Sequence, residues 1–367
     1  MSKVRLGDYV RIKTGKLDAN AASPDGDYPF FTCAVEPLKI DSYSYDCECV
    51  LVAGNGDLNV KYYDGKFDAY QRTYIIESKD NTRLSVPYLY RFLDAYIDTL
   101  RNQSIGGVIK YIKLGNLTEA RINVPAISEQ NKTVKILSFV DELLKKANLQ
   151  LQKLDELIKS RFVEMFDNTQ YPFVKAKEVC YYITKGTTPD ANELFSEYAK
   201  DRVPFLKVYN LSFTGEVLFD QAPQFVSLDT HNDKLSRSKV YPNDVLMNIV
   251  GPPLGKFTLV TNDYPEWNIN QAIAIFRAKE NVNAYYLMQA LMQPNVLRPF
   301  LNNAVGIRQL NLSLEQCRNL EIPLPPMNLQ NQFADFVTKV ERQKATVQKS
   351  IDKLETLKKS LMQEYFG

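Results

Sequence analysis

Two long segments of the chain repeat apolar residues at alternating spacings of three and four. The first set is Leu137, Val140, Leu144, Ala147, Leu151, Leu154 and Ile158. The second set is Val337, Val340, Val347, Ile351, Leu354 and Leu361. Such spacing places the apolar side chains on one stripe of an α-helix, the pattern of a coiled-coil seam. No Gly or Pro lies between Ile127 and Phe166, so about 38 helical residues would span about 57 Å.

Polar residues next to prolines predict where both helices begin. Ser128 and Asn328 can each accept hydrogen bonds from the free N–H groups of a first turn. Lys344 and Lys358 interrupt the second seam. Because a buried lysine would be costly, we expect both to face solvent or the rim of the partner helix. Antiparallel pairing of the two helices would place a globular domain at each end of a rod, whereas two unrelated amphipathic helices are the alternative.

The helices belong to an internal repeat of the chain. The segment 122–125 resembles 322–325, and the offset of 200 holds to Phe166 and Phe366. A second match, at offset 198, pairs Tyr88 with Tyr286, Lys110 with Arg308, and Ile112 with Leu310. The middles, roughly 20–70 and 190–270, barely align. The predicted parts are globular domains at 1–126 and 167–326 and long helices at 127–166 and 327–367.

Each globular domain has the pattern of a mixed α and β fold. Strands are expected at 49–53 and 73–76, with counterparts at 244–247 and 272–276. A helix should follow from 87 to about 102, and again from 284 to about 302. Turns are expected at 54–57 and 59–65. We therefore predict an α+β protein of two such domains, joined by a long antiparallel two-helix coiled coil with pseudo-two-fold symmetry.

Composition excludes several classes of protein. With 45 Lys and Arg against 43 Asp and Glu, the net charge is only +2 and no segment is strongly basic, so nucleic-acid binding would need a local patch. No apolar run approaches the roughly 20 residues of a membrane span. Five cysteines without a CxxC pair and a single histidine argue against a zinc site and a disulfide framework. Together with an N-terminus that lacks an apolar signal core, they predict a cytoplasmic protein.

No motif for catalysis or cofactor binding stands out. The string Gly251-Pro252-Pro253-Leu254 lacks the polar and aromatic ends of an amino-methyltransferase motif. Gly54-Asn55-Gly56 is typical of a turn. The triplets Asp64-Gly65-Lys66 and Glu77-Ser78-Lys79 fit only the short half of a nuclease site, and no phosphate-binding loop is present. His231 is interpreted as a surface loop residue. We predict a chain without catalytic residues, metal or cofactor.

The repeated domain ends resemble those of the specificity (S) subunits of type I restriction–modification systems. In copy two, residues 304–311 lead to Ile322-Pro323-Leu324-Pro325-Pro326 and then to the long helix. In copy one, residues 105–110 lead to Ile122-Asn123-Val124-Pro125. The segments 4–10 and 185–189 look like that family's domain starts. Copy one has Val124-Pro125-Ala126 where the family often has a double proline, so its joint to the helix should differ slightly.

The resemblance implies a non-catalytic DNA-binding subunit of a restriction system. Each globular part would be a target-recognition domain that reads one half of a bipartite site on double-stranded DNA. The helices would set the gap between the half-sites and dock two methyltransferase (M) subunits, which restriction (R) subunits would join. Because the middles of the copies differ, we expect different half-sites and no palindrome.

Polar and aromatic residues of the expected loops are the candidates for DNA contact, because base edges and phosphates are reached by such side chains. In copy one they are Lys13, Lys16, Lys61, Tyr62, Tyr63, Lys66, Arg101, Asn102, Gln103, Lys110 and Tyr111. In copy two they are Lys185, Thr187, Thr188, Lys207, Tyr209, Asn210, Lys234, Arg237, Asn302, Asn303, Arg308 and Gln309. A basic residue recurs at Lys110 and Arg308, which favours this pair.

If Arg308 contacts a phosphate, Arg308→Ala should weaken binding to all DNA sequences and lower the salt dependence of the affinity. The reason is that each neutralised phosphate releases condensed counterions. Titration with DNA at several salt concentrations checks this, and an unchanged affinity and salt slope would remove Arg308 from the interface.

Two other functions remain open at the level of sequence. One is a coiled-coil adaptor that bridges two protein partners without DNA recognition. The other is an enzyme, such as a nuclease or methyltransferase, whose site has no familiar motif. A methyltransferase with an Asn-Pro-Pro-Phe motif encoded next door would favour the specificity subunit.

Overall fold

The computed structural model describes residues 3–166, 171–251, 253–302 and 311–367. The chain divides into two compact units: unit 1 is Met1–Asn148 with Gln348–Gly367, and unit 2 is Leu149–Val347. Both units combine helices with β-sheets, so the predicted α+β class is confirmed. No helix in the described part of the chain has the length and apolar character that crossing a membrane requires.

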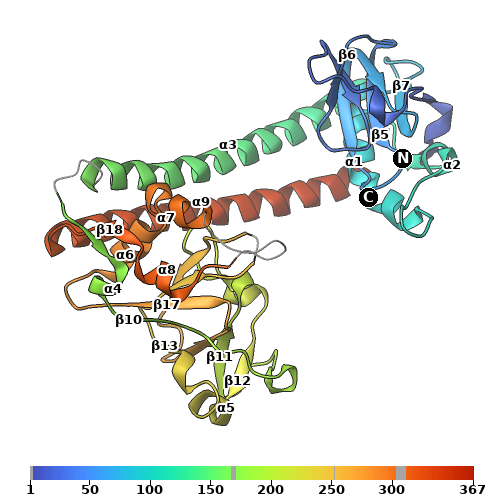
Figure 1. Ribbon diagram of the computed structural model, residues 1–367. Coiled ribbons are helices and arrows are strands. Elements are labelled where there is room, and N and C mark those ends of the chain that lie inside the picture. The colour runs from blue at the N-terminus through green and yellow to red at the C-terminus, as the bar shows by residue number, and fades with distance from the viewer. Residues whose placement is uncertain (1–2, 167–170, 252, 303–310) are drawn as a thin grey trace. The chain divides into compact units, whose positions relative to one another are not determined.

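Two unbroken helices of 40 residues each dominate the secondary structure (Figure 1): α3 (Ile127–Phe166) and α9 (Met327–Phe366). Each begins one residue before the predicted cap. Their apolar repeat positions are shielded from solvent. Leu137, Val140, Leu154, Ile158, Val337, Val340, Val347 and Ile351 are buried. The remaining ones, Leu144, Ala147, Leu151, Leu354 and Leu361, are half-buried.

Unit 1 contains a six-stranded sheet in the order β2-β7-β5-β6-β3-β4. The strands are β2 (Val10–Thr14), β3 (Tyr28–Phe31), β4 (Leu38–Ile40), β5 (Tyr45–Ala53), β6 (Val60–Ala69) and β7 (Thr73–Ser78). Only β3 and β6 pair in parallel. The turn expected at 59–65 is wrong, because β6 runs through it as a strand paired along β5. Helix α1 (Val86–Gln103) packs on β5 and β6 (Figure 1).

Apolar residues of one face of α1 form the core of unit 1 with the sheet. Leu89, Phe92 and Leu93 are buried in one cluster with Val50 and Val52 of β5. A two-stranded pair, β1 (Val4–Arg5) with β8 (Arg121–Ile122), and the short helix α2 (Leu114–Thr118) lead from this core into α3.

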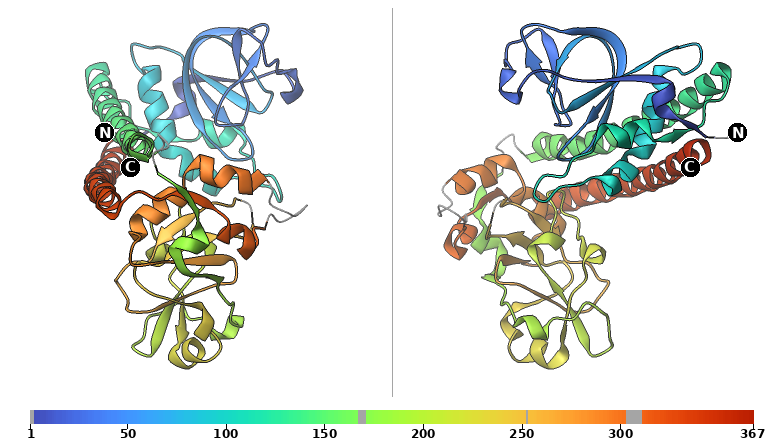
Figure 2. Two further views of the ribbon diagram at one scale, coloured as in Figure 1. Left: turned by 60° about the vertical axis from the view of Figure 1, so that its left-hand side comes forward. Right: turned by 90° about the vertical axis from the view of Figure 1, so that its right-hand side faces the viewer.

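Unit 2 has two four-stranded sheets (Figure 2), in the orders β10-β17-β14-β15 and β12-β11-β16-β13. The first holds β10 (Cys180–Lys185), β14 (Val245–Asn248), β15 (Phe257–Leu259) and β17 (Ile273–Ala278). The second holds β11 (Arg202–Leu206), β12 (Phe225–Ser227), β13 (Lys239–Val240) and β16 (Trp267–Ile269). The remaining elements are α4 (Ala176–Val179), α5 (Leu228–Asn232), α8 (Leu314–Arg318) and the pair β9 (Phe173–Lys175) with β18 (Glu321–Pro323).

The single helix predicted at 284–302 is two helices, α6 (Ala284–Leu291) and α7 (Pro294–Asn302). Pro294 opens α7, where its fixed φ fits the first helical position and its missing N–H would have had no partner. The same residue cannot continue α6, because its ring would clash with the preceding turn. The prediction of one helix was wrong because the apolar pattern runs on past Pro294, although the helix does not.

Matching hydrogen bonds occur inside both units. The amide of Gln130 donates to Pro125 O at 2.8 Å, and that of Gln330 donates to Pro325 O at 2.8 Å. Each glutamine also accepts a hydrogen bond from the backbone N–H just before an earlier helix: from Ser85 N before α1 (3.0 Å) and from Asn283 N before α6 (2.9 Å). These polar bonds fix the joint between each globular domain and its long helix in the same geometry.

The matching bonds correct one pairing of the sequence comparison. Ile112 N donates to Gly54 O and Leu312 N donates to Ile249 O, both at 2.9 Å. Leu312, and not Leu310, is thus the counterpart of Ile112, and the offset here is 200. Arg308 lies outside the described residues, so its equivalence with Lys110 stays a prediction.

A glycine follows directly after β2 in unit 1 and after β10 in unit 2. Gly15 N and Gly186 N donate to Thr73 O and Ile273 O at 3.0 Å. A Cβ on Gly15 would lie 2.1 Å from Ala69 O, and one on Gly186 would lie 2.2 Å from Asn270 O. Any side chain would collide with backbone at both places, which explains why these two glycines are retained in otherwise different loops.

The last turn of one long helix packs on the globular domain of each unit. In unit 1, the ring of Phe366 lies 5.2 Å from Tyr88 and 6.1 Å from Phe92. In unit 2, Phe166 lies 5.1 Å from Tyr286 and 5.5 Å from Phe333. Each globular domain is therefore closed by the helix that follows the other domain in the sequence.

The two lysines that interrupt the second seam are not alike. Lys344 is buried with 7% of its surface exposed, and its ammonium lies 2.9 Å from Asp155, 3.1 Å from Glu341 and 3.5 Å from Glu216. The expectation that it faces solvent or a rim is wrong, because three carboxylates replace the water it loses. Lys358 is half-buried and pairs with Asp141 at 2.8 Å.

Candidate nucleic-acid interface

Three loops of unit 1 meet where β5 passes into β6. Gly56, in the left-handed region at φ 71°, donates its N–H to Lys110 O at 2.9 Å. The amide of Asn59 donates to Cys33 O at 2.8 Å. Ile105 and Tyr111 pair as the base of a short hairpin. These bonds bring the predicted contacts Lys110 and Tyr111 next to the start of β6.

The tip of this hairpin projects into solvent. Val108 is fully exposed, and Ile109 is 62% exposed. Lys110 is exposed as well. Its side chain makes no hydrogen bond or ion pair with the described residues, so it is available to a phosphate.

Four candidates lie on β6, and their surroundings differ. The Tyr62 hydroxyl donates to Glu48 at 2.8 Å, and burial together with this bond raises the pKa of Tyr62 to about 12. It therefore remains a hydrogen-bond donor in neutral solution. Tyr63 packs against Phe31 with ring centroids 5.0 Å apart. The Lys66 ammonium lies over the Tyr43 ring at 4.6 Å, and burial lowers the pKa of Lys61.

Two basic candidates of unit 1 already hold acidic partners. Lys13 donates to Glu77 at 2.8 Å, and this bond raises the pKa of Lys13. Arg101 contacts Asp98 at 2.9 Å and Leu58 O at 3.0 Å. A phosphate would have to displace these carboxylates. By contrast, Lys16, Asn102 and Gln103 are exposed.

The described candidates of unit 2 lie on separate segments of the chain. Thr188 accepts from Gln271 N at 3.2 Å, which holds the segment after β10 on the loop before β17. Lys185 and Arg237 are exposed, Thr187 and Lys207 are half-buried, and Tyr209 is 43% exposed.

Other candidates of unit 2 are tied up or undescribed. Lys234 binds Glu193 at 2.6 Å and Asp190 at 2.8 Å. Asn210 is completely buried, accepts from Lys207 N at 2.9 Å and donates to Leu218 O at 3.2 Å, so its assignment as a DNA contact is wrong in this structure. Asn303, Arg308, Gln309 and the side chain of Asn302 lie outside the described part, and their assignments stay predictions.

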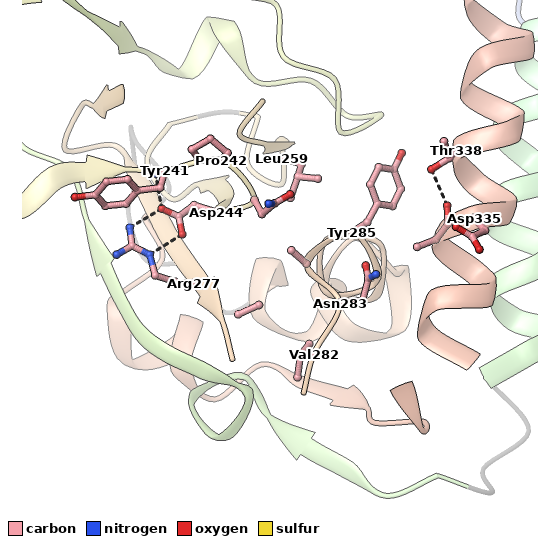
Figure 3. Close-up of a pocket in the computed structure, with 14 residues that line it drawn as sticks. Tyr241, Pro242, Asp244, Leu259, Arg277, Val282, Asn283, Tyr285, Asp335 and Thr338 are labelled. Carbon is pink, nitrogen blue, oxygen red and sulfur yellow. Dashed lines mark hydrogen bonds and ion pairs between the residues drawn. The ribbon is translucent and has the colours of Figure 1, made fainter. Parts of the chain in front are cut away.

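A cavity of about 720 Å³ lies in unit 2 between β17, α6 and α9 (Figure 3). Arg277 dominates one wall: it binds Asp244 at 2.6 and 2.8 Å and lies between the rings of Tyr182 (4.6 Å) and Tyr241 (4.7 Å). Burial opposes its charge, but the bond to Asp244 holds the pKa of Arg277 above its usual value. With its guanidinium satisfied in this way, the cavity presents a structural ion pair rather than a reactive group.

The acidic triplets considered for a nuclease do not converge. Asp64 lies on β6 and Glu77 on β7, and β5 separates these two strands. Glu77 is bound to Lys13. Among the described residues, no three His, Cys, Asp or Glu side chains are grouped as metal ligands would be.

Comparison with known proteins decides the family. The family model described as the type I restriction modification DNA specificity domain matches residues 1–154 and 168–356. The chain belongs to this family. The resemblance recognised in the domain ends is thereby confirmed, and DNA sequence specificity is the property that the family contributes to a type I restriction–modification system.

Individual relatives agree with this membership. A stretch of 156 residues is 38% identical to the EcoDI specificity subunit of Escherichia coli, and it covers 42% of this chain but only 34% of that protein. Over 98% of this chain and 90% of the other, identity to the MjaVIII specificity subunit of Methanocaldococcus jannaschii is 21%. The S subunit structure from M. genitalium has the same fold, with a TM-score of 0.61 at 16% identity over 100% and 96% of the two chains.

The second specificity domain contains a buried polar network that sequence reasoning missed. His231 is completely buried, and the prediction of a surface histidine is wrong. Its Nε2 lies 2.7 Å from Glu266 Oε2, and its Nδ1 lies 2.5 Å from Asn268 Oδ1. The bond to His231 lowers the pKa of Glu266. Glu266 and Asn268 lie more than 30 residues away in the sequence, so the residues around His231 gave no sign of these contacts.

Replacing His231 by Ala should lower the free energy of unfolding of unit 2 by about 2 kcal/mol, because two buried hydrogen bonds lose a partner. Urea unfolding at neutral pH measures the change. Asp233→Ala, two residues away on the exposed surface, serves as the matched control and should change the stability little. Equal stabilities of the two variants would contradict the structural role.

Proposed function

We propose that this chain is the non-catalytic DNA-specificity subunit of a type I restriction–modification complex, in which each globular domain reads one half of a bipartite, asymmetric DNA site. The observation that carries the proposal is that the two domains share the same hydrogen bonds at their edges, whereas the sheet surfaces between those edges differ. The joints between globular domain and long helix, at Gln130 and Gln330, have the same hydrogen bonds in both units. The backbone of Gly15 and that of Gly186 also make matching hydrogen bonds.

The surfaces between these edges differ in shape. In the first domain, β6 is one strand of ten residues that carries Lys61, Tyr62 and Lys66 across the sheet. In the second, its counterpart is divided into β15 and β16, three residues each, in separate sheets. Because base edges are read by side chains set at fixed positions, different surfaces support different half-sites.

Phosphate contacts would come from basic residues without acidic partners. In the first domain these include Lys16, Lys66 and Lys110, which are exposed. In the second, Lys185 and Arg237 fill the same role, with Arg308 as an undescribed candidate. Such contacts position a protein on DNA without reading its sequence, so the tyrosine and amide side chains beside them are left to contact base edges.

The long helices would act as the spacer between the half-sites, paired as an antiparallel coiled coil. Ion pairs within each unit support this pairing: Asp141 of α3 binds Lys358 of α9 in unit 1, and Asp155 of α3 binds Lys344 of α9 in unit 2. An earlier residue of α3 thus meets a later residue of α9. The repeated frame would present two equivalent positions for methyltransferase subunits, which restriction subunits would join.

The test is co-expression with a methyltransferase encoded beside this chain's gene, in a host without other DNA methylation, followed by mapping of methylated bases. We expect one motif of two short specified parts, unlike each other and separated by a fixed gap. A complex that forms but methylates without sequence preference would favour the adaptor function. A near-palindromic motif would contradict the assignment of different half-sites.

A further inference from the structure

The hairpin 105–111 of unit 1 holds two adjacent apolar side chains in solvent at its tip. Val108 is fully exposed, and no large hydrophobic side chain in the described part of the chain is more exposed. Ile109 beside it is also mostly exposed. A single exposed apolar residue is common on protein surfaces, but two neighbours at one tip leave in water an apolar area whose burial would be favourable. We name Val108 and Ile109 the apolar tip.

The backbone of the hairpin is closed by its own hydrogen bonds. Ile105 N donates to Tyr111 O at 3.0 Å, and Tyr111 N donates to Ile105 O at 2.9 Å. Gly106 adopts φ 118°, and a Cβ there would lie 2.5 Å from Ile109 O. Only glycine allows a turn as tight as this one. The backbone therefore holds the apolar tip away from the core of the domain.

Neighbouring loops support the base of the hairpin. Asn55 pairs with Tyr111, and the Cys33 thiol donates to Asn55 Oδ1 at 2.8 Å. Ile112 N donates to Gly54 O at 2.9 Å. Valine and isoleucine have few side-chain rotamers, so a tip supported in this way loses little conformational entropy when it is buried against a ligand. The apolar tip is thus prepared for binding without rearrangement.

The segment that carries the apolar tip is basic. Residues 101–118 contain Arg101, Lys110 and Lys113 and no Asp or Glu. Asp57, from the turn before β6, lies 3.5 Å from Arg101, whereas the side chain of Lys110 has no acidic partner among the described residues. Apolar side chains inside a basic segment match a ligand with an apolar interior and a negative border. Stacked base pairs between two phosphate backbones are such a ligand.

The apolar tip is not repeated in the second copy. Counted back without a gap from the pair Ile112 and Leu312, the offset of 200 aligns Val108 with Arg308 and Ile109 with Gln309. A feature required by the shared fold, or by a partner common to both domains, would be expected in both copies. The apolar tip instead differs between the copies, as residues that read different half-sites would.

We infer that the apolar tip inserts between two base pairs of the half-site read by the first domain and kinks the duplex at that step. Apolar wedges of this kind enter from the minor groove, and here Lys110 would hold an adjacent phosphate. Because the tip has no hydrogen-bonding side chain, it would select a step that unstacks easily, such as a pyrimidine–purine step. This inference rests on the proposed function, in which the first domain reads one half-site.

The test uses the complex of the full chain with the methyltransferase subunit and a duplex that contains the mapped motif. A dye at each end of the duplex reports a kink as increased energy transfer. The wild type should increase the transfer. The double variant Val108→Ala/Ile109→Ala should leave it near the value of free DNA and should bind about tenfold more weakly or worse, because two apolar side chains lose their burial.

Three further variants separate insertion from simple loss of contact. Val108→Ile/Ile109→Val keeps the apolar volume and should retain both the kink and the affinity. Lys110→Ala should weaken binding and lower the salt slope by about one while the kink remains. Leu38→Ala is the matched control, since Leu38 is 44% exposed on β4, at the edge of the same sheet. It should change neither the kink nor the affinity.

The outcomes separate this inference from the function on which it rests. If the wild-type complex methylates no defined motif, both fail. If the double variant binds and bends the duplex as the wild type does, the inference is overturned and the proposed function stands. If the wild type leaves the duplex straight, and uracil in place of thymine weakens binding as much as the double variant does, the tip contacts a thymine methyl group instead. If the double variant loses the methyltransferase subunit rather than DNA, the tip contacts protein and insertion is excluded.

Discussion

Phe166→Ala is expected to lower the free energy of unfolding of unit 2 by about 4 kcal/mol, the cost of removing a large buried aromatic side chain. Phe166 is 1% exposed, and its ring contacts Phe162 (5.1 Å), Tyr286 (5.1 Å) and Phe333 (5.5 Å). Hydrogen exchange read by mass spectrometry should show the amides of α6 and of the first turns of α9 exchanging about a thousandfold faster.

Phe366→Ala is the matched variant for unit 1. Phe366 is 8% exposed and contacts Tyr88 and Phe92, so exchange should accelerate in α1 by a somewhat smaller factor. Each variant should leave the other unit protected. If Phe166→Ala accelerated exchange in α1 as strongly as in α6, the closing of each domain by the other domain's helix would be contradicted.

Lys344→Met should lower the free energy of unfolding of unit 2 by about 3 kcal/mol at neutral pH. Removing one partner of a buried ion pair leaves uncompensated charge, and here Asp155, Glu216 and Glu341 all lose their cation. Burial opposes the charge of Lys344, but the bond to Asp155 and the neighbouring carboxylates hold its pKa above the usual value. Urea unfolding measures the loss, with exposed Lys339→Met as the control.

The loss should depend on pH in a defined direction. Burial raises the pKa of Glu341, which Lys344 in turn lowers. An acid whose folded pKa is raised favours the folded state below its unfolded pKa, and this contribution is lost as the pH rises through the folded pKa. Without the lysine the pKa of Glu341 rises further, so the gap between variant and wild type should narrow toward about pH 4. A gap that widens on acidification would contradict the charge cluster.

Local periodicity was enough to predict the long helices. The apolar repeat predicted both helices, and the capping residues Ser128 and Asn328 placed their starts within one residue of those observed. The joint between each globular domain and its long helix could also be predicted, because the internal repeat shows the same local sequence twice, at Gln130 and at Gln330.

Features fixed by distant partners could not be predicted. Lys344 can be buried because the carboxylates of Asp155 on α3 and of Glu216 bind its ammonium. His231 can be buried because Glu266 and Asn268, at the start of β16, hydrogen-bond both of its ring nitrogens. The local sequence does not show which distant residues will contact these side chains. Composition likewise placed Asn210 among the polar loop residues, although its amide holds its own turn together.

The candidate DNA interface could be predicted only in part. Residue type and loop position selected exposed basic residues such as Lys16, Lys110 and Lys185, but could not tell them from Lys13 or Lys234, which carboxylates already hold. The side chains that read bases depend on surface shape, and β6 differs in shape from its divided counterpart.

The central claim, that each globular domain reads its own half-site, is tested most directly by exchanging one domain. Residues 1–125 are replaced by the corresponding domain of another specificity subunit with a known motif, and methylated bases are mapped after co-expression with the methyltransferase. The account predicts that one half of the motif changes to that of the donor, while the other half and the gap are retained. A motif that is unchanged, or that changes in both halves, would contradict it.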